Sequence, residues 1–191
     1  HLEIPYKVGI GEAAFYGPKL DIQIKNVHGK EDTLITIQID FQLAERFGMT
    51  YVDAEGQTKY PYVIHRTSIG CYERTLALLL EKYAGALPTW LMPEQVRVLP
   101  ISDRLIDDAK KVEEQLSRAG IRVSCDTRSE KVGYKIREAQ LEKIPYMLVI
   151  GDKEVEEGTV SVRSRKEGDL GSMPVESFLS KILQEIATKA K

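Results

Sequence analysis

The stretch YVIHRTSIGCYERTLALLLEKYAG, residues 62–85, decides how the first part of this chain folds. Its first half places β-branched or aromatic residues at alternating positions, which is typical of a strand. Its second half, Arg74–Glu81, is an apolar run of helix formers. The change falls near Gly70, where the backbone tolerates a sharp turn. The sequence therefore predicts a strand that runs into a helix, with Glu73 and Arg74 on the first helical turn.

The polar residues of this stretch also have an ordinary structural explanation. A histidine near a strand end, such as His65, is most often a hydrogen-bonded structural residue. Neighbouring Glu73 and Arg74 are most often a surface ion pair. The pattern alone leaves both a structural and a functional role open.

Two strands are predicted before this stretch, Asp21–Lys25 and Thr33–Phe41, and the turn at residues 26–30 joins them as an antiparallel hairpin. Gln38 and Asp40 fall on the same face of the second strand. A polar face in so apolar a strand needs a ligand, water or neighbouring side chains, although an ordinary solvated face is an equal alternative. Residues 41–50 are expected to be irregular or helical, and residues 53–59 to form a second hairpin turn.

Length and charge limit what the chain can be. Its 191 residues suffice for one large or two small domains. With 27 Lys+Arg against 29 Asp+Glu, the net charge is −2, so a nucleic acid would have to bind local basic patches. Cys71 and Cys125 match no CxxC or CxxH pattern, which favours a reducing, cytoplasmic setting over a disulfide framework. The sequence shows no signal-like segment or apolar run of membrane length, and we expect no membrane association.

The second part of the chain has a different pattern. The proline-punctuated connector ALPTWLMPEQ indicates a domain boundary, which we place between residues 92 and 93. Short apolar strands then alternate with helices, which predicts a mostly parallel sheet flanked by helices. Ser102 is expected to cap the first of these helices and Ser172 the last. The predicted strands are residues 95–101, 121–125, 146–150 and 159–165, and the predicted helices are residues 103–119, 131–143 and 174–189.

HRTSIGCYERTLALLLE resembles the third signature motif of class II aminoacyl-tRNA synthetases, in which a Glu-Arg pair opens a buried helix. GEAAFYGPKLDIQIK, TIQIDFQLAERFGMTY and GALPTWLMPEQVRVLPIS narrow the resemblance to the threonyl-tRNA synthetase family, and AFYGPKLD is the most specific part. The resemblance runs from about Val8 to Glu185. It implies an α+β, antiparallel-sheet remnant of a class II catalytic domain in residues 1–92, with the third motif at 62–84, followed by a mixed, mostly parallel α/β anticodon-binding domain in residues 93–191.

The resemblance implies a threonine–tRNA ligase, which uses ATP to form threonyl-adenylate and transfers the threonine to tRNA(Thr). ATP with Mg²⁺, threonine and tRNA would be the partners, and the full-length cytoplasmic enzyme would be a homodimer. The chain has no start methionine and no match to the second class II motif, so we expect further sequence upstream and an inactive fragment. The oligomeric state of the fragment stays open. The alternative is a stand-alone synthetase-like module that binds tRNA or another partner without catalysis.

The same resemblance assigns residues to the catalytic part. Arg74 matches the arginine that clamps the γ-phosphate of ATP, a task that suits the two-pronged guanidinium. Tyr16 matches a residue that lines the threonine pocket, with a packed turn aromatic as the alternative. Gln38 matches a residue that reaches the bound amino acid. Arg74 is expected to be catalytic, together with Lys19 from the same turn as Tyr16.

Zinc is the metal that the resemblance implies. The family holds it with one Cys and two His, and His65 matches the last of these. One imidazole cannot hold zinc firmly, so the other two ligands are expected upstream; Cys71 is not an obvious partner. In the family, the amino and hydroxyl groups of threonine both bind the ion, which excludes valine.

For the anticodon, the resemblance points to two residues that can read base edges. Glu154 can accept N–H groups from guanine, and Arg163 can donate to a carbonyl oxygen. A local basic cluster suits phosphate, although a solvated helix face explains it as well. The cluster consists of Arg128, Lys131, Lys135 and Arg137.

The chain departs from the family at two positions. Cys71 stands where many members have Ser, and Thr33 stands where some have Gln. A hydrogen bond that those relatives offer there is therefore in doubt in this chain.

Overall fold

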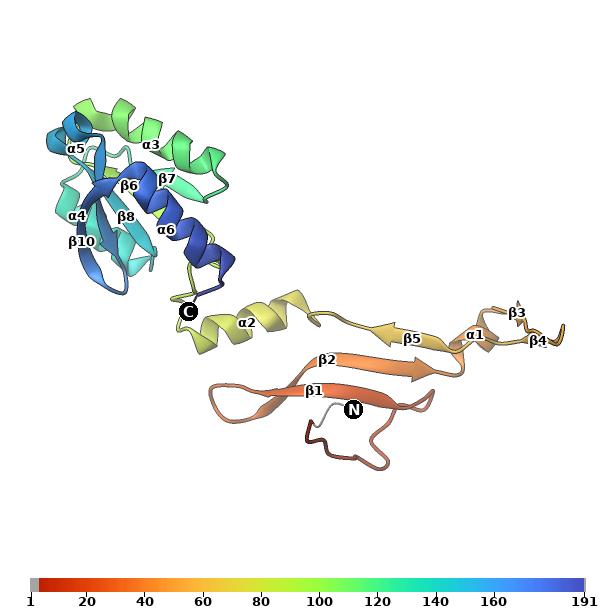
Figure 1. The fold of residues 1–191 in the computed structure, drawn as a ribbon. Helices are drawn as coiled ribbons and strands as arrows, with labels where there is room; N and C mark the ends of the chain where they lie inside the picture. The colour runs from red at the N-terminus through yellow and green to blue at the C-terminus, as the bar shows by residue number, and fades with distance from the viewer. Residues whose placement is uncertain (1–3, 191) are drawn as a thin grey trace. The chain divides into compact units, whose positions relative to one another are not determined.

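The computed structural model describes residues 4–190. They divide into two compact units, of which the first ends at Lys82 and the second begins at Tyr83 (Figure 1). The division falls at the end of the helix predicted from residues 62–85. The connector ALPTWLMPEQ therefore lies inside the second unit, whereas the sequence placed the boundary at residues 92 and 93.

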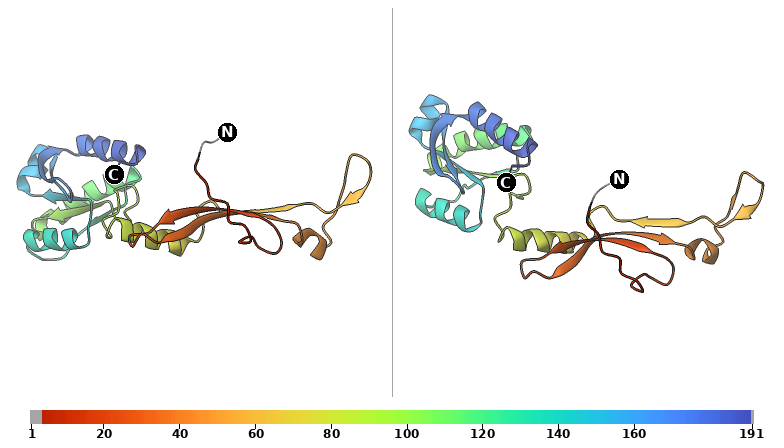
Figure 2. Two further views of the ribbon diagram at one scale, coloured as in Figure 1. Left: turned by 90° about the horizontal axis from the view of Figure 1, so that it is seen from below. Right: turned by 60° about the horizontal axis from the view of Figure 1, so that its bottom comes forward.

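The first unit is built on a sheet of three antiparallel strands in the order β1 (Lys19–Lys25), β2 (Glu31–Asp40) and β5 (Val63–Arg66). The predicted hairpin of β1 and β2 is confirmed, and both views of Figure 2 show the two strands side by side. Asn26 forms its turn, because its side-chain oxygen accepts the backbone N–H groups of His28 and Lys30.

Helix α2 (Tyr72–Lys82) follows β5 at Gly70, as predicted. Gly70 has a φ of +70°, and a Cβ there would lie 2.1 Å from the carbonyl oxygen of Leu34, so only glycine fits. The family motif implies a buried helix, but no residue of α2 is buried in this structure. The remaining elements of the first unit are α1 (Leu43–Arg46) and the short hairpin of β3 (Tyr51–Val52) and β4 (Thr58–Lys59).

The second unit has a sheet of five strands in the order β10-β9-β8-β6-β7. Strand β6 is parallel to β7 and β8, whereas β9 is antiparallel to both β8 and β10. Of these described strands, all but β9 run in one direction, which confirms the predicted mixed, mostly parallel sheet. The strands are β6 (Val96–Pro100), β7 (Val123–Cys125), β8 (Tyr146–Ile150), β9 (Thr159–Ser164) and β10 (Gly168–Pro174), and the helices are α3 (Ile106–Arg118), α4 (Val132–Leu141), α5 (Asp152–Glu157) and α6 (Val175–Ala187), with a 3₁₀ turn at Asp103–Leu105.

Helices cover both faces of this sheet. Helices α3 and α6 pack on one face, where Leu116 and Phe178 join Leu148 in a fully buried cluster. Helix α4 covers the other face, where Ala139 packs against Met147. Neighbouring residues of β8 thus enter opposite cores, because side chains alternate across a strand. Each fully buried large apolar side chain contributes roughly 1.5–3 kcal/mol.

Four features of the second unit differ from the sequence prediction. Helix α5 and strand β10 were not predicted. Ser172 lies inside β10 and does not cap α6, which begins after Pro174 without a side-chain cap. Ser102 stands at the start of the 3₁₀ turn, but its buried hydroxyl makes no hydrogen bond within residues 4–190 and caps nothing.

Candidate functional site

One face of the first unit's sheet carries a row of polar side chains. Lys19, Gln38 and His65 are cross-strand partners, and directly opposite residues in antiparallel strands share a face. Asp40, two residues beyond Gln38, lies on the same face. Tyr16 joins the row because its hydroxyl donates to Gln38 Oε1 at 3.2 Å. The structure thus brings together four of the predicted site residues: Tyr16, Lys19, Gln38 and His65.

Lys19 is held by a neighbouring carboxylate. Its Nζ lies 2.8 Å from Asp21 Oδ2, and Asp21 Oδ1 accepts the hydroxyl of Thr36 at 2.8 Å. The hydrogen bond from Lys19 lowers the pKa of Asp21, although partial burial acts against it, and the same bond raises the pKa of Lys19. Both groups therefore stay charged, and the row contains a fixed cation.

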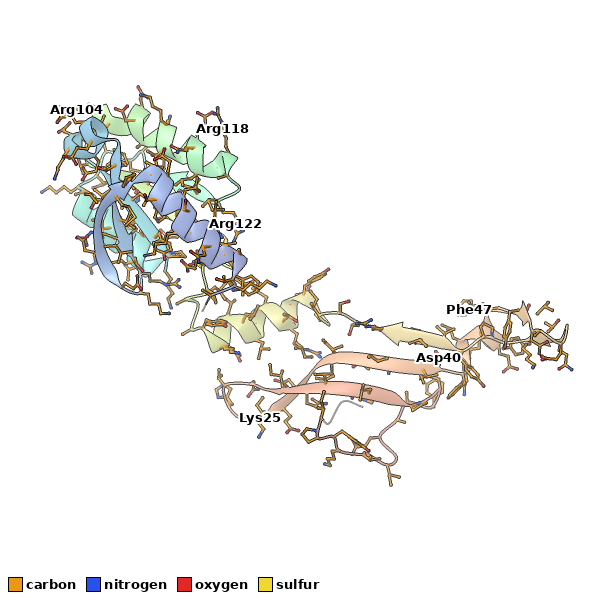
Figure 3. The ribbon with its side chains drawn as sticks, viewed as in Figure 1. Lys25, Asp40, Phe47, Arg104, Arg118 and Arg122 are labelled. Carbon is orange, nitrogen blue, oxygen red and sulfur yellow. The ribbon has the colours of Figure 1, made fainter. Side chains whose placement is uncertain are left out.

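His65 also has a carboxylate partner. Its Nε2 lies 3.2 Å from Oδ2 of Asp40, which Figure 3 labels at the end of β2. Asp40 is 6% exposed, and its Oδ1 accepts the backbone N–H groups of Gln42 and Leu43, both at 2.9 Å. Burial alone would raise the pKa of Asp40, but these two amides and His65 outweigh it and lower the pKa.

The residues present can supply one ligand to a metal ion. Within residues 4–190 no three His, Cys, Asp or Glu side chains gather as a metal site. His65 with Asp40 has the form of a metal-binding histidine, which commonly pairs its second ring nitrogen with a carboxylate. Cys71 does not join it, because its thiol donates to Glu73 Oε2 at 2.7 Å. The donor set therefore fits zinc as one part of a site.

Arg74 lies apart from the polar row. Its Nη1 donates to the backbone carbonyl of Thr33 at 2.9 Å, so the guanidinium points to the start of β2. Glu73 pairs with Cys71, which lowers the pKa of Glu73. Glu73 and Arg74 thus have different partners, and the surface ion pair considered from the sequence does not form.

The two predicted base-reading residues lie on adjacent elements of the second unit. Glu154, on α5, accepts the backbone N–H of Gly151 at Oε2 (3.0 Å) and the hydroxyl of Ser172 at Oε1 (3.4 Å). It therefore caps α5. Arg163, on β9, donates to Asp169 Oδ2 on β10 at 3.0 Å. Both side chains are half-buried, and each has a local partner.

The predicted basic cluster divides in the structure. Lys131, directly before α4, and Arg137, on α4, are both exposed. Arg128 is paired with Asp126 at 2.7 Å and Glu138 at 2.6 Å, so its charge is largely neutralised.

The assignment of Lys135 to this cluster is wrong. The residue is 2% exposed, and its Nζ donates to the carbonyl oxygens of Pro100 at 3.3 Å and Asp126 at 3.0 Å. Lys135 lies on the face of α4 that packs on the sheet, where a phosphate cannot reach it. It is a buried structural cation.

Two arginines that the sequence did not single out attach the connector to the rest of the second unit. Arg165 donates to the carbonyls of Ala86 at 3.3 Å and Leu87 at 2.8 Å, and Arg122 donates to those of Trp90 and Met92. Burial lowers the pKa of Arg165. No sequence pattern marks these contacts, because backbone carbonyls accept them.

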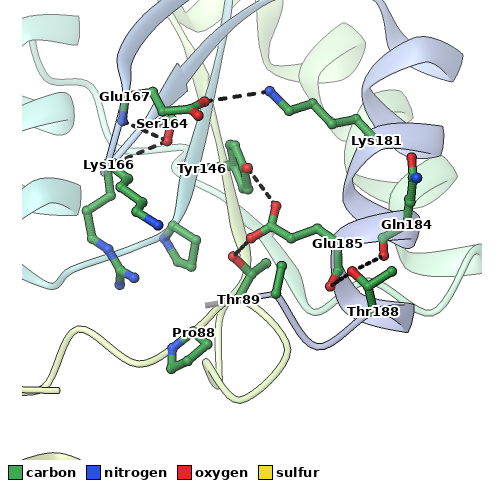
Figure 4. Close-up of a pocket in the computed structure, with 13 residues that line it drawn as sticks. Pro88, Thr89, Tyr146, Ser164, Lys166, Glu167, Lys181, Gln184, Glu185 and Thr188 are labelled. Carbon is green, nitrogen blue, oxygen red and sulfur yellow. Dashed lines mark hydrogen bonds and ion pairs between the residues drawn. The ribbon is translucent and has the colours of Figure 1, made fainter. Parts of the chain in front are cut away.

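A pocket beside the connector is lined by polar side chains that bond to one another (Figure 4). Tyr146 donates to Glu185 Oε2 at 2.6 Å, and Thr89 donates to Oε1 at 2.5 Å. Burial, followed by the contact with Glu185, raises the pKa of Tyr146. Glu185 on α6 therefore ties the connector to β8, a role that the sequence did not reveal.

No helix in residues 4–190 has both the length and the apolar character needed to cross a membrane. Two family models match separate parts of the chain. Residues 5–83 match the tRNA synthetase class II core domain (G, H, P, S and T), and residues 95–185 match the anticodon binding domain.

Individual relatives match nearly the full length of the chain. The chain is 64% identical to a threonine–tRNA ligase of Clostridium perfringens over 189 residues, which are 99% of this chain and 29% of that protein. It is 56% identical to the threonine–tRNA ligase of Caldanaerobacter subterraneus, over 98% of this chain and 29% of that protein. A crystal structure of the RNA binding domain of threonyl-tRNA synthetase from Cryptosporidium parvum matches with a TM-score of 0.80 and 39% identity, over 91% of this chain and 44% of the other. The chain thus spans less than a third of the length of these curated relatives.

Proposed function

The chain matches the C-terminal part of the threonyl-tRNA synthetase family over its whole length, and on this basis we propose that it supplies part of the catalytic sheet and the anticodon-binding domain of a threonine–tRNA ligase. The observation that carries the proposal is the polar row of Tyr16, Lys19, Gln38 and His65 on one face of the sheet. This row combines a phenol, a cation, an amide and an imidazole, and such a set suits a small zwitterionic substrate.

The reaction is attack of the threonine carboxylate on the α-phosphate of ATP, followed by transfer to tRNA. Lys19, kept charged by Asp21, offers positive charge to the phosphates, which is the main catalytic device in such transfers. Arg74 binds the γ-phosphate. Its guanidinium has five N–H donors, so it can keep the carbonyl of Thr33 and still hold a phosphate bound with Mg²⁺.

His65 is proposed as one ligand of a zinc ion whose other ligands come from outside the described residues. The bound zinc would act as a Lewis acid that takes the amino and hydroxyl groups of threonine and so rejects valine. Asp40 supports this role of His65, because it occupies the other ring nitrogen. Gln38, fixed by Tyr16, orients the amino acid.

The second unit is proposed to bind the anticodon of tRNA(Thr) in the cytoplasm, within a homodimeric full-length enzyme. Glu154 and Arg163 read base edges, while Lys131 and Arg137 contact phosphates without sequence preference. Arg128 is committed to Asp126 and Glu138, so we assign it a smaller share of the phosphate contacts.

The test uses the complete protein encoded around these residues. We expect threonine-dependent ATP–pyrophosphate exchange, with no exchange by the 191-residue chain alone. Arg74→Ala should slow adenylate formation by about 2–4 kcal/mol of transition-state free energy and leave tRNA affinity nearly unchanged. Lys30→Ala, in the exposed turn of the β1–β2 hairpin, is the matched control and should leave the rate unchanged.

The second candidate function is tRNA binding without catalysis. It is favoured by the complete, well-packed second unit, whose core needs nothing from the first. A complete protein that binds tRNA(Thr) but shows no threonine-dependent exchange would establish this alternative and contradict the ligase.

A further inference from the structure

We propose that Asp40 is a positioning residue that fixes the tautomer of His65, with the hydrogen on Nε2 and the lone pair on Nδ1. What Nδ1 then binds rests on the proposed function. The tautomer itself is a property of this chain and does not depend on a metal ion or on catalysis.

The orientation of the Asp40 carboxylate is set by the backbone that follows it. Oδ1 accepts the N–H groups of Gln42 and Leu43, both at 2.9 Å, where the chain turns from β2 into α1. Asp40 is 6% exposed, and its carboxyl group cannot turn away without leaving two amides unpaired. Oδ2 is thereby left facing the ring of His65 at 3.2 Å.

The imidazole is the adaptable member of the pair. The side chain of His65 is 44% exposed, so packing alone does not fix its ring. Asp40 lies opposite Val63, and His65 lies opposite Gln38, which makes Asp40 and His65 diagonal neighbours on one face. The cation of the same row does not compete for Asp40, because Lys19 is paired with Asp21.

Hydrogen-bond chemistry then decides the tautomer. An ionised carboxylate has only acceptors, and Oδ1 of Asp40 already accepts two backbone N–H groups, so Oδ2 faces the ring as an acceptor. Nε2 must therefore donate, and a neutral imidazole that donates from Nε2 has its lone pair on Nδ1. A carboxylate on one ring nitrogen also makes the other a more basic metal ligand.

The decisive variant is Asp40→Asn, which keeps the shape of the side chain. Since two N–H groups occupy the position of Oδ1, the amide oxygen of the asparagine must take that position. Its NH₂ group then faces His65 and has no lone pair to offer. Nε2 must become the acceptor, so the hydrogen should move to Nδ1 and the tautomer should invert.

Nitrogen-15 NMR of the labelled 191-residue chain, in mildly alkaline buffer, reports which ring nitrogen carries the hydrogen. His28 is the internal reference, because it lies exposed in the turn of the β1–β2 hairpin. Asp21→Asn is the matched control, a carboxylate of the same face that contacts Lys19 rather than His65, and it should leave the His65 tautomer unchanged.

We expect His65 to be wholly the Nε2–H form in the unmutated chain and the Nδ1–H form in Asp40→Asn. A His65 spectrum that shows the same tautomer mixture as His28 would overturn the proposal, and this comparison needs no variant to fold. An unchanged tautomer in a folded Asp40→Asn chain would overturn it as well.

The role toward the metal is tested separately in the complete protein by competition with a zinc chelator. Asp40→Asn should weaken zinc binding about ten- to hundred-fold, whereas Asp21→Asn should not. Equal zinc affinity in both variants would overturn the positioning role. Failure of the proposed function would show differently, as a lack of threonine-dependent exchange by the unmutated complete protein, with the tautomers of His65 unaffected.

Discussion

Glu154 combines a structural contact with a proposed recognition role, and the two can be separated. Its Oε2 caps α5 by accepting the N–H of Gly151. Glu154→Ala should therefore lower the free energy of unfolding by about 0.5–2 kcal/mol, as measured by urea unfolding. Glu154→Gln keeps an acceptor at the same position and should cost much less.

The same two variants test how a guanine of the anticodon is read. Both Glu154→Ala and Glu154→Gln should reduce the difference in binding free energy between the cognate stem-loop and a loop altered at that guanine by roughly 1–3 kcal/mol. The reason is that the two oxygens of a carboxylate can accept two N–H groups of guanine, whereas the single oxygen of the glutamine amide replaces only one of these acceptors. Lys131→Ala should weaken both loops equally. Equal affinity of the unmutated chain for the two loops would contradict the base contact.

The two cysteines should differ sharply in reactivity. Burial, with a further contribution from Glu113, raises the pKa of Cys125 to about 11, while Cys71 is exposed. Since the thiolate is the nucleophile, only about one Cys125 in a thousand would be reactive near pH 8. Iodoacetamide should alkylate Cys71 first, and peptide mass spectrometry should show Cys125 modified only as the pH rises toward 11. Equal labelling of both residues at pH 8 would show that β7 opens readily.

Single residues were the least predictable level of this structure. The spacing of Gln38 and Asp40 was enough to place both on one face, because strand periodicity fixes which side a residue takes. Lys135 was assigned to the wrong environment, because a lysine in a helix is usually solvated and sequence spacing does not reveal two carbonyl acceptors beneath it.

Helix α4 is the element on which that buried lysine can be tested. Lys135→Met keeps the aliphatic volume but leaves the carbonyls of Pro100 and Asp126 without this donor, at an expected cost of about 1–3 kcal/mol. Lys131→Met, at the exposed start of the same helix, should change stability by no more than about 0.5 kcal/mol. Chemical denaturation of both variants checks the difference, and equal stabilities would place Lys135 on the surface after all.

Elements with strong periodicity were predicted, and short or glycine-containing ones were not. Strands β6 and β8 are apolar runs that enter two cores, so their pattern is plain. Helix α5 is six residues long, which is too short to show a helical period, so the sequence pattern does not predict it. Strand β10 contains two glycines and ends at a proline, and these residues are unfavourable in strands. It forms because it pairs with the backbone of β9 at the edge of the sheet.

At the scale of the whole molecule, the boundary between the units can be tested by truncation. Residues 83–191 should fold and bind the anticodon stem-loop alone, whereas residues 93–191 should be less stable by roughly 3 kcal/mol or more. The shorter chain lacks the buried side chains of Leu87 and Met92. It also lacks the carbonyl groups of Ala86 and Leu87 that accept hydrogen bonds from Arg165. Urea unfolding of the two chains measures the difference, and equal stability would return the boundary to residues 92 and 93.

The grouping of the polar row is a property of the whole first unit. Sequence resemblance named Tyr16, Lys19, Gln38 and His65, and strand register brought them together. The resemblance did not name Asp40 as the partner of His65 or Asp21 as the partner of Lys19. These pairs depend on which carboxylate the register of the strands places nearby.

Helix α2 also determines how this chain behaves in solution. Leu76 is 52% exposed and Leu80 is 43% exposed, and Ile64 on β5 is 67% exposed. Leu76 and Leu80 lie four residues apart and therefore share one face of α2. Exposed apolar side chains that gather on one face bind hydrophobic dyes and promote self-association. Concentrated solutions of the 191-residue chain should therefore scatter light more strongly than solutions of residues 83–191. Leu76→Glu with Leu80→Lys should reduce that turbidity without affecting the second unit.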